Sequence, residues 1–243
     1  MASPSSKPLD SKVALVTGAS RGIGFAVAHT LARLGAAVGI CSRDAQKLEA
    51  AAARLRSSVP GGKILALPVD VTRAEQIAVL IDRTSRDLGP IEVVVNNAGV
   101  GYFGPTHEAS ETNWDTVLDT NLKSVFLVSR AVAPGMVERR SGHIINISSL
   151  AGKNAFAGGG IYCASKWGLL GLTQCMAEDL RTHNIRVAAI CPGTVHTDFG
   201  AHVGKDPRKM LQPEDVAHAV EMLVTQQPRS FISEVLLRPT LKP

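Results

Sequence analysis

The chain has 243 residues, 45% of them hydrophobic and only 4% aromatic, which predicts one α/β domain with an aliphatic core rather than a β-sandwich. The formal net charge is +5, but no basic tract is accompanied by a row of aromatic residues, so we expect no nucleic-acid partner. No apolar run reaches the ~18 residues of a membrane span, and residues 1–12 lack the apolar stretch of a secretory signal, so a soluble cytoplasmic protein without a membrane partner is expected.

Short β-branched runs alternate with longer helical patterns along the chain. Strands are predicted at Val13–Val16, Ala37–Cys41, Ile64–Leu67, Ile91–Val95, His143–Ile147, Arg186–Ile190 and Glu234–Leu237. Helices are predicted at Ile23–Leu34, Ala45–Ser57, Ala74–Leu88, Asn113–Glu138, Ile161–His183 and Pro213–Thr225. This alternation predicts a doubly wound Rossmann-type fold, with a parallel sheet of about seven strands and helices on both faces. No repeat or linker divides the chain, so residues 1–243 are expected to form one domain, with residues 1–10 as a flexible tail.

The first strand is followed by a glycine-rich turn that opens a helix. Glycine allows a tight turn and close approach of the backbone, and the free N–H groups of a helix N-terminus attract a pyrophosphate. A turn that serves only helix–strand packing is the alternative. The expected cofactor-binding residues here are Gly18, Ser20, Arg21, Gly22, Ile23 and Gly24.

The second strand ends in Ser42 and Arg43 rather than in the acidic residue that usually binds the ribose of NAD. Arg43, together with Arg21, is expected to bind the 2′-phosphate of NADP through charge-assisted hydrogen bonds. Asp44 argues for NAD unless it caps the next helix. The sequence therefore favours NADP(H) as the cofactor.

The next two strand ends also carry candidate cofactor contacts. Asp70, followed by Val71, is expected to accept a hydrogen bond from the adenine amino group, or alternatively to cap a helix. Asn97, Ala98 and Gly99 offer small residues and an amide beside a flat ligand, with an ordinary turn as the alternative.

Tyr162 and Lys166 are four residues apart on a predicted helix, so their side chains share one face. A nearby ammonium and the positive nicotinamide of an oxidised cofactor are expected to lower the pKa of the tyrosine. Ser149 lies thirteen residues before Tyr162, at a strand end, and its hydroxyl is suited to polarise a substrate carbonyl.

These motifs, with Asn121 in the preceding helix, resemble the short-chain dehydrogenase/reductase family over nearly the whole chain, and most closely its 3-oxoacyl-acyl-carrier-protein reductases. The resemblance implies that Tyr162 is the general acid, that Lys166 binds the nicotinamide ribose, that Ser149 orients the carbonyl and that Asn121 holds a relay water. It selects Ser149 over its neighbour Ser148, for which a supporting role is expected. It also implies nicotinamide contacts from Pro192, Gly193, Val195 and Thr197.

The other features of note are one irregular loop, a histidine, the cysteines and the C-terminus. Thr197–Leu211 is a candidate substrate lid, with an ordinary surface connection as the alternative, and His196 is expected to be a bystander. Cys163 is expected to pack in the core, and all four cysteines are expected to be buried thiols that bind no metal. The C-terminus lacks the Gly-Gly segment of many relatives.

The function that follows is NADPH-dependent reduction of a carbonyl, with a 3-oxoacyl thioester as the leading substrate. A broad ketone or aldehyde reductase, a sugar or steroid alcohol dehydrogenase, and a nucleotide-sensing regulator without turnover are the alternatives. The resemblance also implies a homodimer or homotetramer built on the helices that contain Asn121 and Tyr162.

Overall fold

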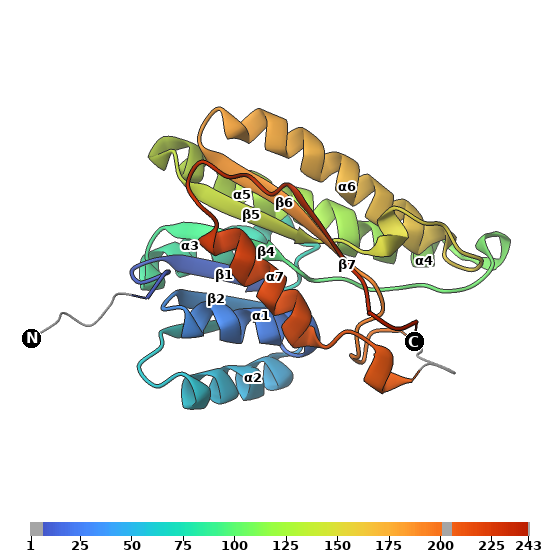
Figure 1. Ribbon diagram of the computed structural model, residues 1–243, viewed down its shortest axis with the longest axis horizontal. Helices are drawn as coiled ribbons and strands as arrows, with labels where there is room; N and C mark the ends of the chain where they lie inside the picture. The colour runs from blue at the N-terminus through green and yellow to red at the C-terminus, as the bar shows by residue number, and fades with distance from the viewer. Residues whose placement is uncertain (1–6, 201–205, 243) are drawn as a thin grey trace, which may run out of the picture.

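The computed structural model describes residues 7–200 and 206–242. Its centre is a parallel sheet of seven strands in the order β3-β2-β1-β4-β5-β6-β7, drawn in Figure 1 with helices on both sides. This architecture confirms the predicted doubly wound fold. The strands are β1 (Val13–Thr17), β2 (Ala37–Ser42), β3 (Ile64–Pro68), β4 (Ile91–Asn96), β5 (Gly142–Ile147), β6 (Ile185–Pro192) and β7 (Glu234–Leu237).

Two apolar layers flank the sheet, because each helix buries one aliphatic stripe against the strands. The first layer contains α1, α2 and α7, and the second contains α3, α5 and α6. The helices are α1 (Gly22–Arg33), α2 (Ala45–Ser58), α3 (Ala74–Leu88), α4 (Glu111–Leu118), α5 (Ser124–Arg139), α6 (Gly160–Arg181) and α7 (Pro213–Thr225), and short 3-10 turns cover Thr106–Glu108, Leu150–Gly152 and Pro207–Lys209.

The predicted single helix Asn113–Glu138 is interrupted in the structure. It begins earlier, at Glu111, because Ser110 and Asn113 form a reciprocal capping box. Between α4 and α5 the backbone forms a π-turn over Asp119–Lys123. Single π-turns within helices are frequent at functional sites, and this one carries Asn121.

The structure differs from expectation at one cysteine and at the start of the chain, and it describes only part of the candidate lid. Cys175 is exposed, because it lies on the solvent side of α6, whereas the other three cysteines are buried. Residues 7–10 are not a flexible tail, since Leu9 is buried and its N–H donates to Leu34 O at 2.9 Å; residues 1–6 lie outside the described residues. The candidate lid falls partly on residues 201–205, which are also outside them, and its far end is fixed by a bridge between Val195 and Leu211.

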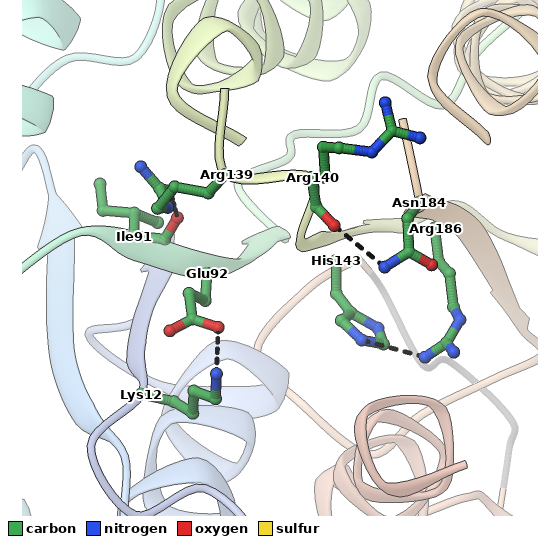
Figure 2. A network of polar contacts seen from close by, with 8 residues as sticks. All are labelled: Lys12, Ile91, Glu92, Arg139, Arg140, His143, Asn184 and Arg186. Carbon is green, nitrogen blue, oxygen red and sulfur yellow. Dashed lines mark hydrogen bonds and ion pairs between the residues drawn. The ribbon is translucent and has the colours of Figure 1, made fainter. Parts of the chain in front are cut away.

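A polar network lies at the amino ends of β4, β5 and β6 (Figure 2). Lys12 pairs with Glu92 at 2.5 Å, and Arg139 donates to Ile91 O at 2.8 Å. Nearby, Arg186 Nη1 lies 3.3 Å from His143 Nε2. Burial, followed by the charges of Arg186 and Lys12, lowers the pKa of His143 to about 4, so this imidazole is neutral and accepts the arginine N–H.

The depressed pKa of His143 predicts an acid-sensitive stability. The unfolded chain, with a histidine pKa near 6.5, binds the proton more tightly than the folded chain, so stability is present at neutral pH and lost as pH falls towards 4. Linkage predicts that the free energy of unfolding drops by about 2 kcal/mol between roughly pH 7.5 and pH 5 through this residue. Denaturant titrations of the chain and of His143→Gln, which keeps an acceptor for Arg186, measure the difference. An equal drop in both proteins would contradict this assignment.

Candidate active site

The carboxyl ends of the strands surround a cavity of about 1280 Å³. Open α/β sheets bind ligands at this edge, and the volume exceeds that of ordinary small-ligand pockets. The cavity is lined by every predicted site residue except Gly24 and Asn121: Gly18, Ser20, Arg21, Gly22, Ile23, Ser42, Arg43, Asp70, Val71, Asn97, Ala98, Gly99, Ser149, Tyr162, Lys166, Pro192, Gly193, Val195 and Thr197.

The glycine turn packs tightly against the end of β4. Gly18 has φ +65°, and a Cβ there would lie 2.8 Å from Ala98 Cα. A Cβ on Gly24 would lie 2.5 Å from Gly18 O, so Gly24 has a packing role behind the cavity. The N-terminus of α1 has no side-chain cap and no acidic residue in its first turn. Its backbone therefore fits an anionic phosphate group.

Asn97 joins this turn to β4. Its backbone N–H donates to Thr17 Oγ1 at 3.0 Å, and its side-chain amide donates to Thr17 O at 2.9 Å and to Gly18 O at 3.1 Å. Thr17 also accepts from Ala98 N and is buried. Thr17 is thus a positioning residue that the sequence analysis missed, although its place directly before Gly18 was a usable signal.

The end of β2 carries the charges expected to select the cofactor. Asp44 caps α2 by accepting from Lys47 N at 3.0 Å, and this bond holds the pKa of Asp44 below its usual value. This geometry confirms the capping role that the sequence left as one of two readings. Arg43 is exposed at the cavity. Arg21 forms an exposed ion pair with Asp198 at 2.9 Å, so its use for a 2′-phosphate requires exchange of this partner.

Asp70 does not cap a helix, because the N-cap of α3 is Arg73. Its Oδ1 accepts from the backbone N–H of Thr72 at 2.9 Å and from the Thr72 hydroxyl at 2.8 Å. Burial raises the pKa of Asp70, but the Thr72 bonds and the charges of Arg43 and Arg73 outweigh burial and lower it. The carboxylate is therefore ionised at the cavity wall and able to accept further hydrogen bonds.

The predicted pair on α6 lies at the inner end of the cavity. Lys166 is buried, and its Nζ donates to Ile147 O at 2.9 Å and lies 5.8 Å from the centroid of the Tyr162 ring. Burial lowers the pKa of Lys166 to about 8. Burial also raises the pKa of Tyr162 to about 12, against a smaller lowering by a hydrogen bond with Ser149. In the protein alone, desolvation of the phenolate thus outweighs the Ser149 hydrogen bond, whereas the expected lowering also included the charge of an oxidised nicotinamide.

Asn121 uses its side chain to fix the loop after β4. Its Oδ1 accepts from Val100 N at 2.8 Å, while Nδ2 donates to Val100 O at 2.8 Å and to Ser165 Oγ at 3.0 Å. A Cβ on Gly99 would lie 3.3 Å from Asn121 Oδ1 and 3.9 Å from Lys166 Nζ, so the absence of a side chain leaves room where these groups converge. Ser165 is a second positioning residue that the sequence did not reveal.

The neighbouring candidates have supporting contacts. Ser148 is buried, and its hydroxyl donates to Lys166 O at 3.4 Å, in agreement with a supporting role. Cys163 packs against Ala151 and Tyr162, as predicted. His196 is exposed and is not among the cavity-lining residues. Within residues 7–200 and 206–242, no group of three metal-ligating side chains is found, and no helix is long and apolar enough to span a bilayer.

Comparisons with known proteins agree with this geometry. The family model for short chain dehydrogenases matches residues 12–208. An uncharacterised oxidoreductase of Staphylococcus saprophyticus is 35% identical over 95% of this chain and 98% of its own length. A glycine betaine reductase of Emericella nidulans is 35% identical over 97% of this chain, which spans only 19% of that longer protein.

Two solved structures are similar over almost their full lengths. A metagenomic short-chain oxidoreductase in complex with NADP is 44% identical, with a TM-score of 0.85 over 97% of this chain and all of its own. An alcohol dehydrogenase of the archaeon Thermococcus sibiricus, complexed with 5-hydroxy-NADP, is 30% identical, with a TM-score of 0.88 over 96% of this chain and 98% of its own.

Proposed function

Because the chain belongs to the short-chain dehydrogenase family, we propose that it reduces a carbonyl group to an alcohol with NADPH. When bound, the cofactor supplies the hydride that forms the new C–H bond at the carbonyl carbon. Tyr162 gives its phenolic proton to the carbonyl oxygen, so that the C=O π-bond becomes C–OH. Ser149 donates a hydrogen bond to the same oxygen as negative charge develops there.

The observation that supports this function best is that Tyr162, Ser149 and Lys166 lie together on the wall of the cavity. Burial raises the pKa of Tyr162 to about 12, so the phenol is protonated at neutral pH, as a general acid must be. After Tyr162 has given up its proton, we propose that a new proton reaches it through Lys166 and a relay water held by Asn121.

The choice of NADP over NAD is supported by the end of β2. The carboxylate of Asp44 accepts the capping hydrogen bond of α2. Arg43 is exposed at the cavity, and its guanidinium is a group that pairs well with phosphate. The NADP of the metagenomic relative and the 5-hydroxy-NADP of the archaeal alcohol dehydrogenase add support. The adenine contact of Asp70 and the nicotinamide contacts of Pro192, Gly193, Val195 and Thr197 belong to the same proposal.

The substrate is proposed as a ketone or aldehyde of broad range. A 3-oxoacyl thioester, the leading expectation from the sequence, receives no support from the relatives, whose names include a betaine reductase and an alcohol dehydrogenase. A screen that follows NADPH absorbance with acetoacetyl thioesters, diketones, aldehydes and sugars separates these classes. Rapid reduction of simple ketones with negligible turnover of acetoacetyl thioesters is the expected result; no carbonyl-dependent oxidation of NADPH in the whole panel would overturn the proposal.

Self-association through α4, α5 and α6 is proposed as well. These helices leave Phe126 and Trp167 about half exposed. A hollow of about 430 Å³ between them is lined mainly by apolar side chains, among them Leu118, Leu122 and Leu172, and also by the ion pair of Asp119 and Lys123. Exposed apolar patches of this kind mark protein interfaces. Sedimentation analysis is expected to give a dimer or tetramer that Phe126→Glu dissociates, and a monomeric wild-type chain would refute the proposal.

A further inference from the structure

A group of aromatic rings surrounds the proposed proton donor at one end of the cavity. The ring centroid of Phe103 lies 5.4 Å from that of Tyr162, and the centroid of Phe199 lies 5.8 Å from it. Phe156 extends the group, with its centroid 6.3 Å from that of Phe103. We call Phe103, Phe156 and Phe199 the aromatic mouth; it contains three of the six phenylalanines in the chain, all at the cavity wall.

The aromatic mouth is built from three separate loops. Phe103 follows β4, Phe156 lies between β5 and α6, and Phe199 follows β6. The first two loops are joined by a hydrogen bond from Gly104 N to Gly158 O at 2.8 Å. This bond therefore ties the loop of Phe103 to the loop of Phe156 beside Tyr162.

Glycines make room for these rings. A Cβ on Gly101 would lie 2.6 Å from the Phe103 ring and 3.3 Å from the Phe199 ring, and a Cβ on Gly159 would lie 2.5 Å from the Phe156 ring. A side chain at either glycine would therefore displace the ring beside it from its present position. The two glycines thus allow the rings to pack directly against the backbone.

The packed rings still present apolar surface. Phe103 and Phe156 are each 48% exposed and Phe199 is 38% exposed, although all three touch another ring. Clustered apolar exposure at a cavity is typical of a ligand site. The carboxylate of Asp198, next to Phe199, is paired with Arg21 in the protein without cofactor. Uncharged residues provide the adjoining wall: Val100, Leu150, Ala151, Asn154, Ala155 and Gly200.

We propose that the aromatic mouth binds a flat apolar group attached directly to the reacting carbonyl, so that aryl ketones and aryl diketones are the preferred substrates. This inference rests on the proposed function, because it takes Tyr162 as the group that meets the carbonyl oxygen. Phe103 and Phe199 both lie beside the Tyr162 ring, so a substituent that touches them occupies the same end of the cavity as the proposed proton donor. Edge-to-face and offset contacts with phenylalanine favour an aryl group over an alkyl chain of similar size.

A matched pair of substrates tests the proposal. In 1-phenyl-1,2-propanedione and 1-cyclohexyl-1,2-propanedione the same vicinal diketone carries either a flat phenyl ring or a saturated ring of the same carbon number. We expect kcat/KM with NADPH to be at least about tenfold higher for the phenyl compound, and Phe156→Ala to reduce this ratio by about fivefold or more. Phe156 suits this test because it is a surface residue outside direct ring contact with Tyr162.

Phe231→Ala is the control, since Phe231 is 37% exposed but does not line the cavity; its ratio should equal that of the wild type. A wild-type ratio near one, or a ratio unchanged by Phe156→Ala, would overturn the inference. If Phe156→Ala fails to fold, Phe156→Leu, which keeps apolar bulk but removes the flat ring, provides the same comparison.

A binding measurement separates this inference from the proposed function. Calorimetric titration of the two diketones in the presence of NADP⁺ reports affinity without reduction. If neither compound is turned over, the proposed reductase function fails for this class, yet about tenfold tighter binding of the phenyl compound that is lost in Phe156→Ala would still support the mouth. Equal affinities for the two compounds would refute it.

Discussion

Replacing Tyr162 with phenylalanine is expected to lower kcat for carbonyl reduction by about a thousandfold, the scale of a lost general acid. The variant keeps the ring that contacts Phe103 and Phe199 but removes the only hydroxyl proposed to protonate the substrate. NADPH binding should change little, because the phosphate turn and the end of β2 lie elsewhere on the cavity wall. Steady-state kinetics and fluorescence titration of NADPH measure the two effects separately.

Tyr102→Phe is the matched control for this change. Tyr102 is the other tyrosine in the chain, it is not among the residues that line the cavity, and the substitution removes the same hydroxyl. We expect near wild-type kcat for this variant. Retention of full activity in Tyr162→Phe would remove Tyr162 from the chemistry altogether.

The second large effect is expected at the cofactor-selecting end of the cavity. Arg43→Asp should weaken NADPH binding by about 1–3 kcal/mol, the worth of a hydrogen bond between charged groups. This corresponds to roughly 5- to 150-fold in the dissociation constant. The new carboxylate would repel a 2′-phosphate and accept from a 2′-hydroxyl, so binding of NADH should improve relative to NADPH. Dissociation constants for both cofactors, measured by fluorescence, give the ratio.

Arg56→Asp controls for the change in net charge. Arg56 also lies in this region of the chain, on α2, but it pairs with Glu49 and is absent from the cavity wall. Its cofactor ratio should remain that of the wild type. If Arg43→Asp leaves the ratio of the NADPH and NADH dissociation constants unchanged, Arg43 does not select the cofactor, and Arg21 or another residue must do so.

Much of the fold was predictable because its signals are local. The strand runs and helix periodicities placed all seven strands and predicted helices on both faces of the sheet, and glycine or asparagine at strand ends marked the cavity edge. Gly18, Arg43 and Ser149 therefore fell at the cavity as expected. The break between α4 and α5 was not predictable in the same way, because a π-turn adds one residue to a hydrogen-bonded ring without disturbing the helical composition around it.

What the sequence did not reveal depends on contacts between distant segments. Arg21 and Asp198 are 177 positions apart, and the rings of the aromatic mouth come from three loops that only the folded sheet brings together. Burial raises the pKa of Tyr162 in the protein alone, and a spacing of four residues reveals the nearby amine but not this depth of burial. The sequence shows which residue types are present, but their burial and their contacts are known only from the folded structure.

The most direct test of the account follows the hydride itself. The chain is incubated with 1-phenyl-1,2-propanedione and NADPH deuterated on either face of the nicotinamide C4, and the alcohol is analysed by mass spectrometry and NMR. We predict one alcohol formed per NADPH oxidised, with deuterium on the former carbonyl carbon from one face only, and loss of this product in Tyr162→Phe. Binding of NADPH without any labelled alcohol, or an alcohol free of deuterium from both labelled forms, would contradict the assignment of this chain as a carbonyl reductase.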